Sequence, residues 1–234
     1  MNLFYSKNTN IKHKEILLID QENRHLTKVL RKKKGDLINV TNGKGVLFTC
    51  IIVESNKNNS KLEIKKYSIF NDDFPKLKIG ISLTKKTNRF EWFLEKATEI
   101  GVSEITPIIS LNTERVKLNY DRSNKLILSA MKQSLRYKLP KLNSPVSFLD
   151  YISKSNNSYD SYIATCLLKK TYLFKDILKK GNNSEIIIGP EGGFSNNEID
   201  LAKKVNFTTV SLGNNRLRTE TAGIIACSIF STIN

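Results

Sequence analysis

The chain has 234 residues, 39% of them hydrophobic, and a formal net charge of +16 at pH 7. The length allows one large core or two small ones. The charge predicts a polyanionic partner such as nucleic acid, with a solvated lysine-rich surface as the alternative interpretation. The amino-terminal stretch is too polar for a signal peptide, and no later run approaches the roughly 20 apolar residues of a membrane helix, so we expect a cytoplasmic protein with no membrane partner.

Three cysteines, Cys50, Cys166 and Cys227, lie far apart in the sequence. Their spacing fits neither a disulfide framework nor a metal site, and we expect them to be buried and reduced. The sequence also lacks a Walker A motif, a G-x-G-x-x-G motif and a histidine-rich cluster. This disfavours nucleotide-dependent hydrolases, dehydrogenases and metalloenzymes, and we predict no metal site.

Short strand-like segments dominate the first part of the chain, with one helical segment at residues 22–30 and a hairpin signal at Asn42-Gly43. The strand-like runs are residues 16–19, 37–40, 46–53 and 62–69. Such a pattern predicts a small β-barrel over residues 1–71. The polar turn that begins at Asn71 and contains Pro75 is the expected domain boundary.

A cationic cluster, Arg31 to Lys34, follows the predicted helix of this first domain. One interpretation is contact with RNA phosphates, which positions a nucleic acid without reading its sequence. The alternative is a favourable interaction with the carboxyl end of the helix. His25 lies nearby beside an apolar residue, and we assign it no catalytic role.

From residue 72 onward the pattern alternates between strands and helices, which is typical of βαβ units and predicts an α/β domain with a parallel sheet over residues 72–234. Its first helix carries apolar residues on one face and should end at Gly101, a typical residue beyond a helix end. The expected strands are residues 77–83, 104–109 and 162–166, and the expected helices are residues 89–100, 122–137 and 173–178.

Two glycine-containing loops near the carboxyl end each follow a short apolar run. The first run, residues 186–188, ends at Gly189-Pro190, and the second, residues 210–212, ends at Gly213. Ser195 and Glu198 have the spacing of a capping box and predict a helix start after the first loop. Both loops should open at the carboxyl edge of the sheet, where ligands bind in this fold class.

The first loop is a poor phosphate cradle, because Glu191 lies within the turn and no G-K-[ST] follows it. A carboxylate beside flexible backbone suits ribose hydroxyls or a cationic ligand better. The alternative is a tight strand-to-helix turn without a ligand.

Together these loops resemble the paired signature of the ribosomal RNA small subunit methyltransferase E family, the 16S rRNA uridine-N3 methyltransferases of the SPOUT superfamily: IGPEGGFSNNEI and LGNNRLRTETA. Three further segments are similar to the same family in the same order: HLTKVLRKKKGDLINVTNGKG, EKATEIGVSEITPIIS and AMKQSLRYKLPKL. The resemblance therefore covers nearly the whole chain.

The resemblance implies a SPOUT-type α/β knot, in which a parallel sheet ends in a trefoil knot, preceded by a PUA-like or OB-like RNA-binding barrel. Sequence reasoning alone would predict an unknotted sheet. The resemblance further implies S-adenosyl-L-methionine as cofactor, 16S rRNA or the small ribosomal subunit as partner, a role in ribosome biogenesis, and a homodimer. The alternatives are another SPOUT rRNA or tRNA methyltransferase, and a non-catalytic RNA-binding protein with a degenerate pocket.

Matching the family's motifs residue by residue implies a cofactor pocket built from both loops and from the end of an earlier strand. The implied pocket residues are Leu167, then Ile188, Gly189, Pro190, Glu191, Gly192 and Gly193, then Leu212, Gly213, Asn215, Arg216, Leu217, Arg218 and Thr219. Main-chain groups would read the adenine, and Leu217 would pack on it.

Methyl transfer to uracil N3 requires that N3 lose its proton and that the resulting anion be stabilised. Arg136 and Arg218 are the implied electrostatic helpers, and Glu220 is the candidate proton acceptor, with a helix-dipole role as its alternative. Many family members have an acidic residue where this chain has Lys132. The implied RNA contacts are Arg31, Lys32, Lys33, Arg115 and Gln133.

Overall fold

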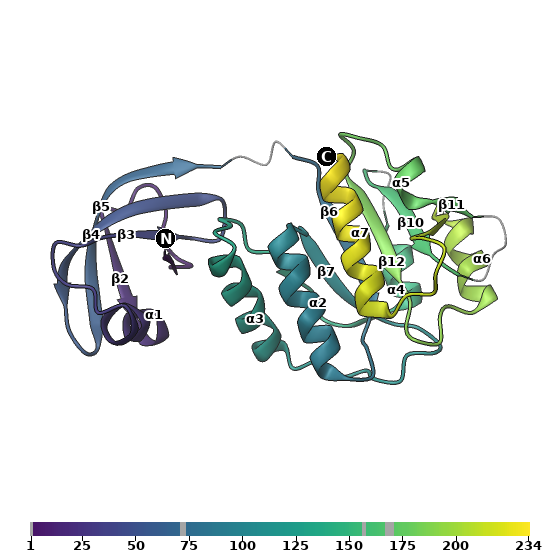
Figure 1. Cartoon of the computed structure of the whole chain (residues 1–234), viewed down its shortest axis with the longest axis horizontal. Coiled ribbons are helices and arrows are strands. Elements are labelled where there is room, and N and C mark those ends of the chain that lie inside the picture. The colour runs from purple at the N-terminus through teal and green to yellow at the C-terminus, as the bar shows by residue number, and fades with distance from the viewer. Residues whose placement is uncertain (1, 71–73, 156–157, 167–170) are drawn as a thin grey trace. The chain divides into compact units, whose positions relative to one another are not determined.

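The computed structural model describes residues 2–70, 74–155, 158–166 and 171–234, in two compact units (Figure 1). The first unit consists of Met1–Asp72 and Met131–Leu139, and the second of Asp73–Ala130 and Pro140–Asn234. The expected boundary at residues 71–72 lies outside the described residues.

The first unit contains a five-stranded sheet in the order β1-β3-β4-β5-β2, antiparallel except for the β1–β3 pair. The strands are β1 (Leu3–Tyr5), β2 (Glu15–Ile19), β3 (Leu37–Thr41), β4 (Val46–Ser55) and β5 (Asn59–Ile69). Its core gathers inward-facing residues of these strands, among them Phe4, Val40, Phe48 and Leu62, around Leu26. The alternating burial of β2 and β3 explains why the sequence pattern predicts strands in these segments.

The helical segment of the first unit differs from the uniform helix expected for residues 22–30. An α-helix, α1 (Asp20–Arg24), continues into a π-helix, η1 (His25–Val29), in which the Leu30 amide donates to the His25 carbonyl over 3.0 Å. The π-helical turn brings Leu26 into the core, where it is fully buried.

Residues Met131–Leu139 belong to the first unit because they pair with its β3–β4 turn. The Tyr137 carbonyl accepts from the Gly45 amide over 2.8 Å and from the Thr41 hydroxyl over 3.2 Å, and the Leu139 amide donates to the Gly43 carbonyl over 2.9 Å. The helix expected for residues 122–137 is α3 (Tyr120–Gln133), which ends earlier than predicted.

The second unit is built on an eight-stranded sheet whose pairings are all parallel, with the path β11-β13-β10-β12-β6-β7-β8 and β9 paired to β7. The expected α/β class with a parallel sheet is confirmed. The strands are β6 (Leu77–Ser82), β7 (Glu104–Ile109), β8 (Lys141–Leu142), β9 (Val146–Ser147), β10 (Asp160–Ala164), β11 (Tyr172–Leu173), β12 (Ser184–Ile188) and β13 (Thr208–Ser211).

Helices cover both faces of this sheet (Figure 1). A Cβ atom added at Gly223 of α7 (Thr219–Ile233) would meet Ile81, whereas one added at Gly80 would meet Tyr151 of α4 (Phe148–Ser153). Because neighbouring strand residues point to opposite faces, α7 and α4 cover opposite faces. The remaining helices are α2 (Thr87–Ile100), α5 (Phe174–Ile177) and α6 (Asn196–Lys204).

The prediction of three buried cysteines is wrong for one of them. Cys50 and Cys227 are buried, and burial raises the pKa of Cys50 to about 12, but Cys166 is exposed. It lies just beyond the end of β10, where the chain has left the sheet. Among the described residues, no helix combines the length and the hydrophobicity needed to cross a membrane.

Close packing of α7 on α2 predicts a stability effect at Gly223. A Cβ atom there would lie 2.6 Å from the Phe93 ring and 3.0 Å from Ile81. We expect Gly223→Val to lower the free energy of unfolding by about 1–3 kcal/mol, because Phe93 is fully buried and has no space into which to move. Urea denaturation measures this change. Ser228→Val, on the exposed side of the same helix, is the matched control, and an equal loss in both variants would contradict the prediction.

Candidate functional site

Loops from four strands meet at the carboxyl edge of the parallel sheet. These loops follow β6, β7, β12 and β13, and they come together because parallel strands all end at the same edge. Both loops singled out in the sequence, after β12 and after β13, belong to this group. Hydrogen bonds between their backbones and side chains define how the loops join.

The loop after β12 is a tight turn. The Gly193 amide donates to the Pro190 carbonyl over 2.8 Å, and Gly193 has a φ of +75°, which glycine adopts without strain. The Glu191 carboxylate accepts from the Lys85 amide over 3.0 Å, which connects this turn to the loop after β6. Glu191 is thus engaged in joining two loops.

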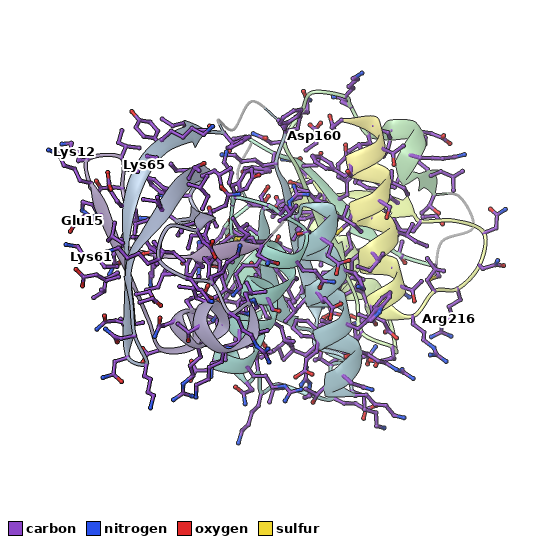
Figure 2. All side chains as sticks on the ribbon, turned by 60° about the vertical axis from the view of Figure 1, so that its left-hand side comes forward. Lys12, Glu15, Lys61, Lys65, Asp160 and Arg216 are labelled. Atoms are coloured by element: carbon purple, nitrogen blue, oxygen red, sulfur yellow. The ribbon has the colours of Figure 1, made fainter. Side chains whose placement is uncertain are left out.

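The chain after β13 contacts the loop after β12 at two points. The exposed Arg216 donates through Nη2 to the Glu191 carbonyl over 2.9 Å, and the Thr219 hydroxyl donates to the Gly189 carbonyl over 2.9 Å. Figure 2 shows Arg216 projecting from the loop that follows β13. The structure therefore brings the two glycine-containing loops side by side.

The loop after β7 completes the site, and sequence reasoning missed most of it. Asn112 donates to the Gly193 carbonyl over 3.0 Å, and a Cβ atom on Gly192 would lie 3.0 Å from Asn112. A signal was present in the sequence, because Leu111-Asn112-Thr113 follows a predicted strand that ends at the same edge. Glycine at position 192 is what allows this close approach.

The predicted capping box at the start of α6 is confirmed and has a further role. Ser195 caps α6, and the Glu198 carboxylate accepts from the Ser195 amide over 2.8 Å. The other oxygen of the buried Glu198 accepts from the Leu111 amide over 2.9 Å. One carboxylate thus fixes both the helix start and the loop after β7.

Glu220, in the first turn of α7, is a buried carboxylate with an unused acceptor. Its side chain is 8% exposed, and Oε1 lies 3.6 Å from Nε of Arg89, a residue of α2. Oε2 is buried and has no hydrogen-bond partner among the described residues. Sequence reasoning did not select Arg89, because only the packing of α2 against α7 brings it to Glu220.

Arg115, also in the second unit, has guanidinium N–H donors without a partner among the described residues. Its Nη1 donates to the Thr87 hydroxyl over 3.0 Å, and its guanidinium lies 5.7 Å from the Phe90 ring centroid. Nε and Nη2 are buried and have no partner among the described residues, and burial lowers the pKa of Arg115. Because buried donors are normally paired, Arg115 and Glu220 are the groups most in need of a ligand at this edge.

The other predicted site residues divide between the two units. Arg218 is the exposed residue that precedes α7, Leu217 is half-buried, and Ile188 is the buried last residue of β12. Gln133 and Arg136 belong to the first unit, together with Arg31, Lys32 and Lys33, and burial lowers the pKa of Arg136. Leu167 lies outside the described residues.

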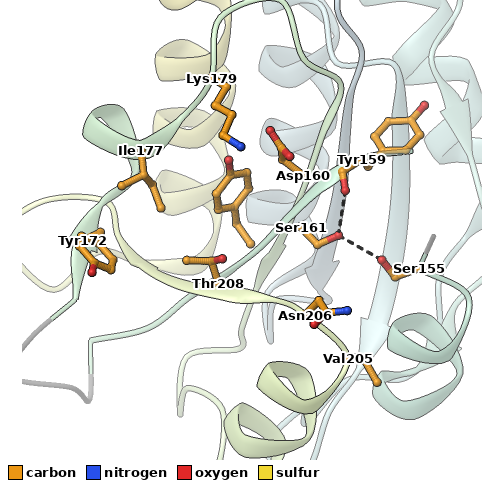
Figure 3. A pocket seen from close by; sticks show the side chains of 11 residues that line it. Ser155, Tyr159, Asp160, Ser161, Tyr172, Ile177, Lys179, Val205, Asn206 and Thr208 are labelled. Carbon is orange, nitrogen blue, oxygen red and sulfur yellow. Dashed lines mark hydrogen bonds between the residues drawn. The ribbon is translucent and has the colours of Figure 1, made fainter. Parts of the chain in front are cut away.

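A cavity of about 560 Å³ lies at the opposite, amino edge of the sheet (Figure 3). Its lining includes the first residues of three strands: Asp160 of β10, Tyr172 of β11 and Thr208 of β13. None of the predicted site residues that the structure describes lines this cavity, so it is separate from the site at the carboxyl edge.

Comparison with known proteins identifies matching families and structures. A family described as "RNA methyltransferase domain" matches residues 72–231, and "RNA methyltransferase PUA domain" matches residues 18–65. Ribosomal RNA small subunit methyltransferase E of Mesomycoplasma hyopneumoniae is 37% identical over 71% of this chain and 74% of its own length.

Two solved structures are similar over nearly the whole chain. A probable rRNA-methyltransferase from Porphyromonas gingivalis has a TM-score of 0.93 and 33% identity, covering 100% of this chain and 98% of its own. A ribosomal RNA small subunit methyltransferase E from Neisseria gonorrhoeae, bound to S-adenosyl methionine, has a TM-score of 0.89 and 26% identity. The match covers 99% of this chain and 97% of the Neisseria chain.

The two roles of Glu198 predict a measurable loss of stability. We expect Glu198→Ala to lower the free energy of unfolding by about 1–2 kcal/mol, because the capping box is lost and the Leu111 amide loses its acceptor. Urea denaturation measures the loss. Asn197→Ala, an exposed change in the same helical turn, should stay within about 0.5 kcal/mol of the unmodified protein. Similar values for the two variants would remove the structural role assigned to Glu198.

Proposed function

This chain belongs to the ribosomal RNA small subunit methyltransferase E family of RNA methyltransferases, and from that premise we propose that it methylates N3 of a specific uridine in 16S rRNA. S-adenosyl-L-methionine is the proposed methyl donor. The observation that carries this proposal is the junction of the loops after β12 and β13 at the carboxyl edge, through Arg216 and Thr219. The Neisseria gonorrhoeae relative bound to S-adenosyl methionine supports the choice of cofactor.

The residues at this edge fit such a cofactor. Gly193, where an added Cβ atom would meet nothing within 4 Å, leaves main-chain groups open to close approach, and half-buried Leu217 offers apolar surface for the adenine. The buried Oε2 of Glu220 has no partner among the described residues and requires a hydrogen-bond donor close to it. The cofactor, when bound, supplies a sulfonium methyl group that is already activated for transfer.

The protein's part in the reaction is to orient the uracil, remove the N3 proton and stabilise the resulting anion. We assign proton acceptance to Glu220, whose free acceptor is buried at the start of α7. We assign to Arg218 and Arg136 the stabilisation of the negative charge that spreads onto the uracil carbonyl oxygens. A guanidinium suits this task because it stays charged and presents several donors.

RNA binding is assigned mainly to the first unit. Residues 1–71 form the proposed PUA-like RNA-binding domain, in agreement with the match over residues 18–65, and residues 72–234 form the proposed methyltransferase domain. Arg31, Lys32 and Lys33 are proposed to hold phosphates, with Gln133 and Arg115 as further RNA contacts. The SPOUT-type knot, the homodimer and the cytoplasmic location complete the proposal.

Glu191 and Arg218 provide the first test. We expect Glu191→Ala to weaken S-adenosylmethionine binding roughly tenfold, because the loop after β12 loses its tie to the Lys85 amide. Arg218→Ala should reduce turnover by roughly 10- to 100-fold through lost anion stabilisation. Isothermal titration and single-turnover methyl transfer measure the two effects. The controls Asp200→Ala and Arg122→Ala remove an acidic and a basic side chain away from these loops. Wild-type behaviour of both site variants would refute the assignment.

The reaction itself is tested by locating the methyl group. Small ribosomal subunits from cells that lack this gene should accept one methyl group per particle from labelled S-adenosylmethionine. Digestion of the RNA and chromatography of the nucleosides should then yield 3-methyluridine. A different methylated nucleoside would reassign the substrate, and no transfer to ribosomal RNA would reject the proposal.

A further inference from the structure

Two arginine–glutamate pairs involve helix α2, and they differ in how the carboxylate is used. Glu91 of α2 accepts hydrogen bonds from Nε and Nη2 of Arg122, one on each of its oxygens. In the second pair, Oε1 of Glu220 lies 3.6 Å from Nε of Arg89, and Oε2 of Glu220 has no partner among the described residues. The Arg122 pair is therefore saturated within the protein, whereas the Arg89 pair leaves one carboxylate oxygen for another group.

The packing of α2 on α7 fixes the position of Arg89 against Glu220. Arg89 lies in the first turn of α2, and Glu220 lies in the first turn of α7. One turn further along each helix, a Cβ atom added at Gly223 would lie 2.6 Å from the Phe93 ring. Because residues three or four positions apart share a helix face, this close contact keeps the two side chains of the pair together.

Both helix starts are also attached to the loop after β12. The Thr219 hydroxyl, next to Glu220, donates to the Gly189 carbonyl over 2.9 Å. The Lys85 amide, in the segment that leads into α2, donates to the Glu191 carboxylate over 3.0 Å. The pair is thus held among the loops that form the site at the carboxyl edge of the sheet.

Burial and Arg89 act on the Glu220 carboxyl group in opposite directions. The side chain of Glu220 is 8% exposed, and removal from water favours the neutral form of a carboxyl group. A guanidinium within ion-pair distance favours the charged form, and the side chain of Arg89, which is 29% exposed, keeps contact with water. A carboxyl group must be charged to accept a proton.

Among the residues that the structure describes, Arg89 is the only cation within ion-pair distance of Glu220. Helix α7 also packs against β6, β12 and α5. The charged residues of these elements lie at the amino edge of the sheet or are exposed: Lys78 of β6, Glu185 of β12, and Lys175 and Asp176 of α5. Arg218, which precedes α7, is exposed, and further along α2 Lys96 pairs with Glu95 and Glu99. Control of the charge on Glu220 therefore falls to Arg89.

We propose that Arg89 is a positioning residue that keeps Glu220 charged and oriented, so that Oε2 accepts the N3 proton of the uracil, an inference that rests on the proposed function for the reaction. The proton moves from N3 to Oε2, and the electron pair of the broken N–H bond stays on N3. Because Arg89 faces the other oxygen, it acts through Glu220. Its role thus differs from that of Arg218 and Arg136, to which we assign stabilisation of the uracil anion.

The test replaces Arg89 by methionine, which keeps an unbranched apolar side chain and removes the charge. Single-turnover methyl transfer to small ribosomal subunits should slow by roughly 10- to 100-fold, because a neutral Glu220 accepts no proton. Arg89→Gln, which keeps a hydrogen-bond donor, should be equally slow. Arg89→Lys should recover most of the rate, because lysine restores the charge. S-adenosylmethionine affinity of Arg89→Met should stay close to the wild-type value, and a loss of affinity as large as the loss of rate would overturn the proposal.

A double-mutant cycle shows whether Arg89 acts through Glu220. Glu220→Gln should also be slow, and adding Arg89→Met to it should cause no further loss of rate. Arg122→Met is the matched control, because it removes an arginine from the saturated pair on α2, and it should keep the wild-type rate. Multiplied losses in the double variant, a wild-type rate for Arg89→Gln, or equal slowing by Arg122→Met would overturn the proposal.

Infrared difference spectroscopy separates this inference from the proposed function, because it needs no substrate. Relative to the wild type at neutral pH, Arg89→Met should gain the C=O stretch of a protonated carboxyl group, and the double variant should lack that band. Absence of the band in Arg89→Met would overturn the inference and leave the proposed function intact. Absence of methyl transfer by the wild type would reject the proposed function, whereas the band would still support control of the Glu220 charge by Arg89.

Discussion

Two hydrogen bonds, from Arg216 to the Glu191 carbonyl and from Thr219 to the Gly189 carbonyl, hold the loops after β12 and β13 together. These loops follow strands that are separated by β10 in the sheet, so strand pairing alone does not join them. Glu198 and Asn112 then attach the loop after β7 to the same assembly. Every role proposed for the carboxyl edge depends on this mutual attachment, because a binding site requires fixed relative positions of its groups.

Two buried glutamates illustrate how structural and ligand-binding roles can be distinguished. Glu185, at the amino edge, is 5% exposed and accepts hydrogen bonds from the hydroxyls of Ser155, Ser161 and Tyr151. Burial, with Glu185 nearby, raises the pKa of Tyr151 well above its usual value, so the tyrosine remains a donor. Glu220 is equally buried but has an acceptor without a partner. Since buried polar atoms are normally satisfied, Glu185 is explained by the fold, and Glu220 requires a further group.

Sequence reasoning succeeded where a structure is fixed by residues close together in the chain. The capping box of Ser195 and Glu198 and the end of α2 at Gly101 depend on a few neighbouring residues, and both are confirmed. The roles of Arg89 and Asn112 depend on contacts with distant segments, which periodicity does not encode. The π-helix was missed for a similar reason, since its extra residue per turn is set by the packing of Leu26 into the core. The expectations of the cofactor, the substrate and a knot came from resemblance alone.

The chain enters the first unit twice, because Met131–Leu139 returns to it from the second. A fragment that stops after β5 would therefore leave the Gly45 amide without the Tyr137 carbonyl and the Gly43 carbonyl without the Leu139 amide. It would also lose the ring contact between Phe70 and Tyr137, whose centroids lie 4.4 Å apart. The amino-terminal unit is thus not an independent module that can be excised or transplanted by a single cut. Any exchange of this unit between relatives would have to carry the returning segment with it.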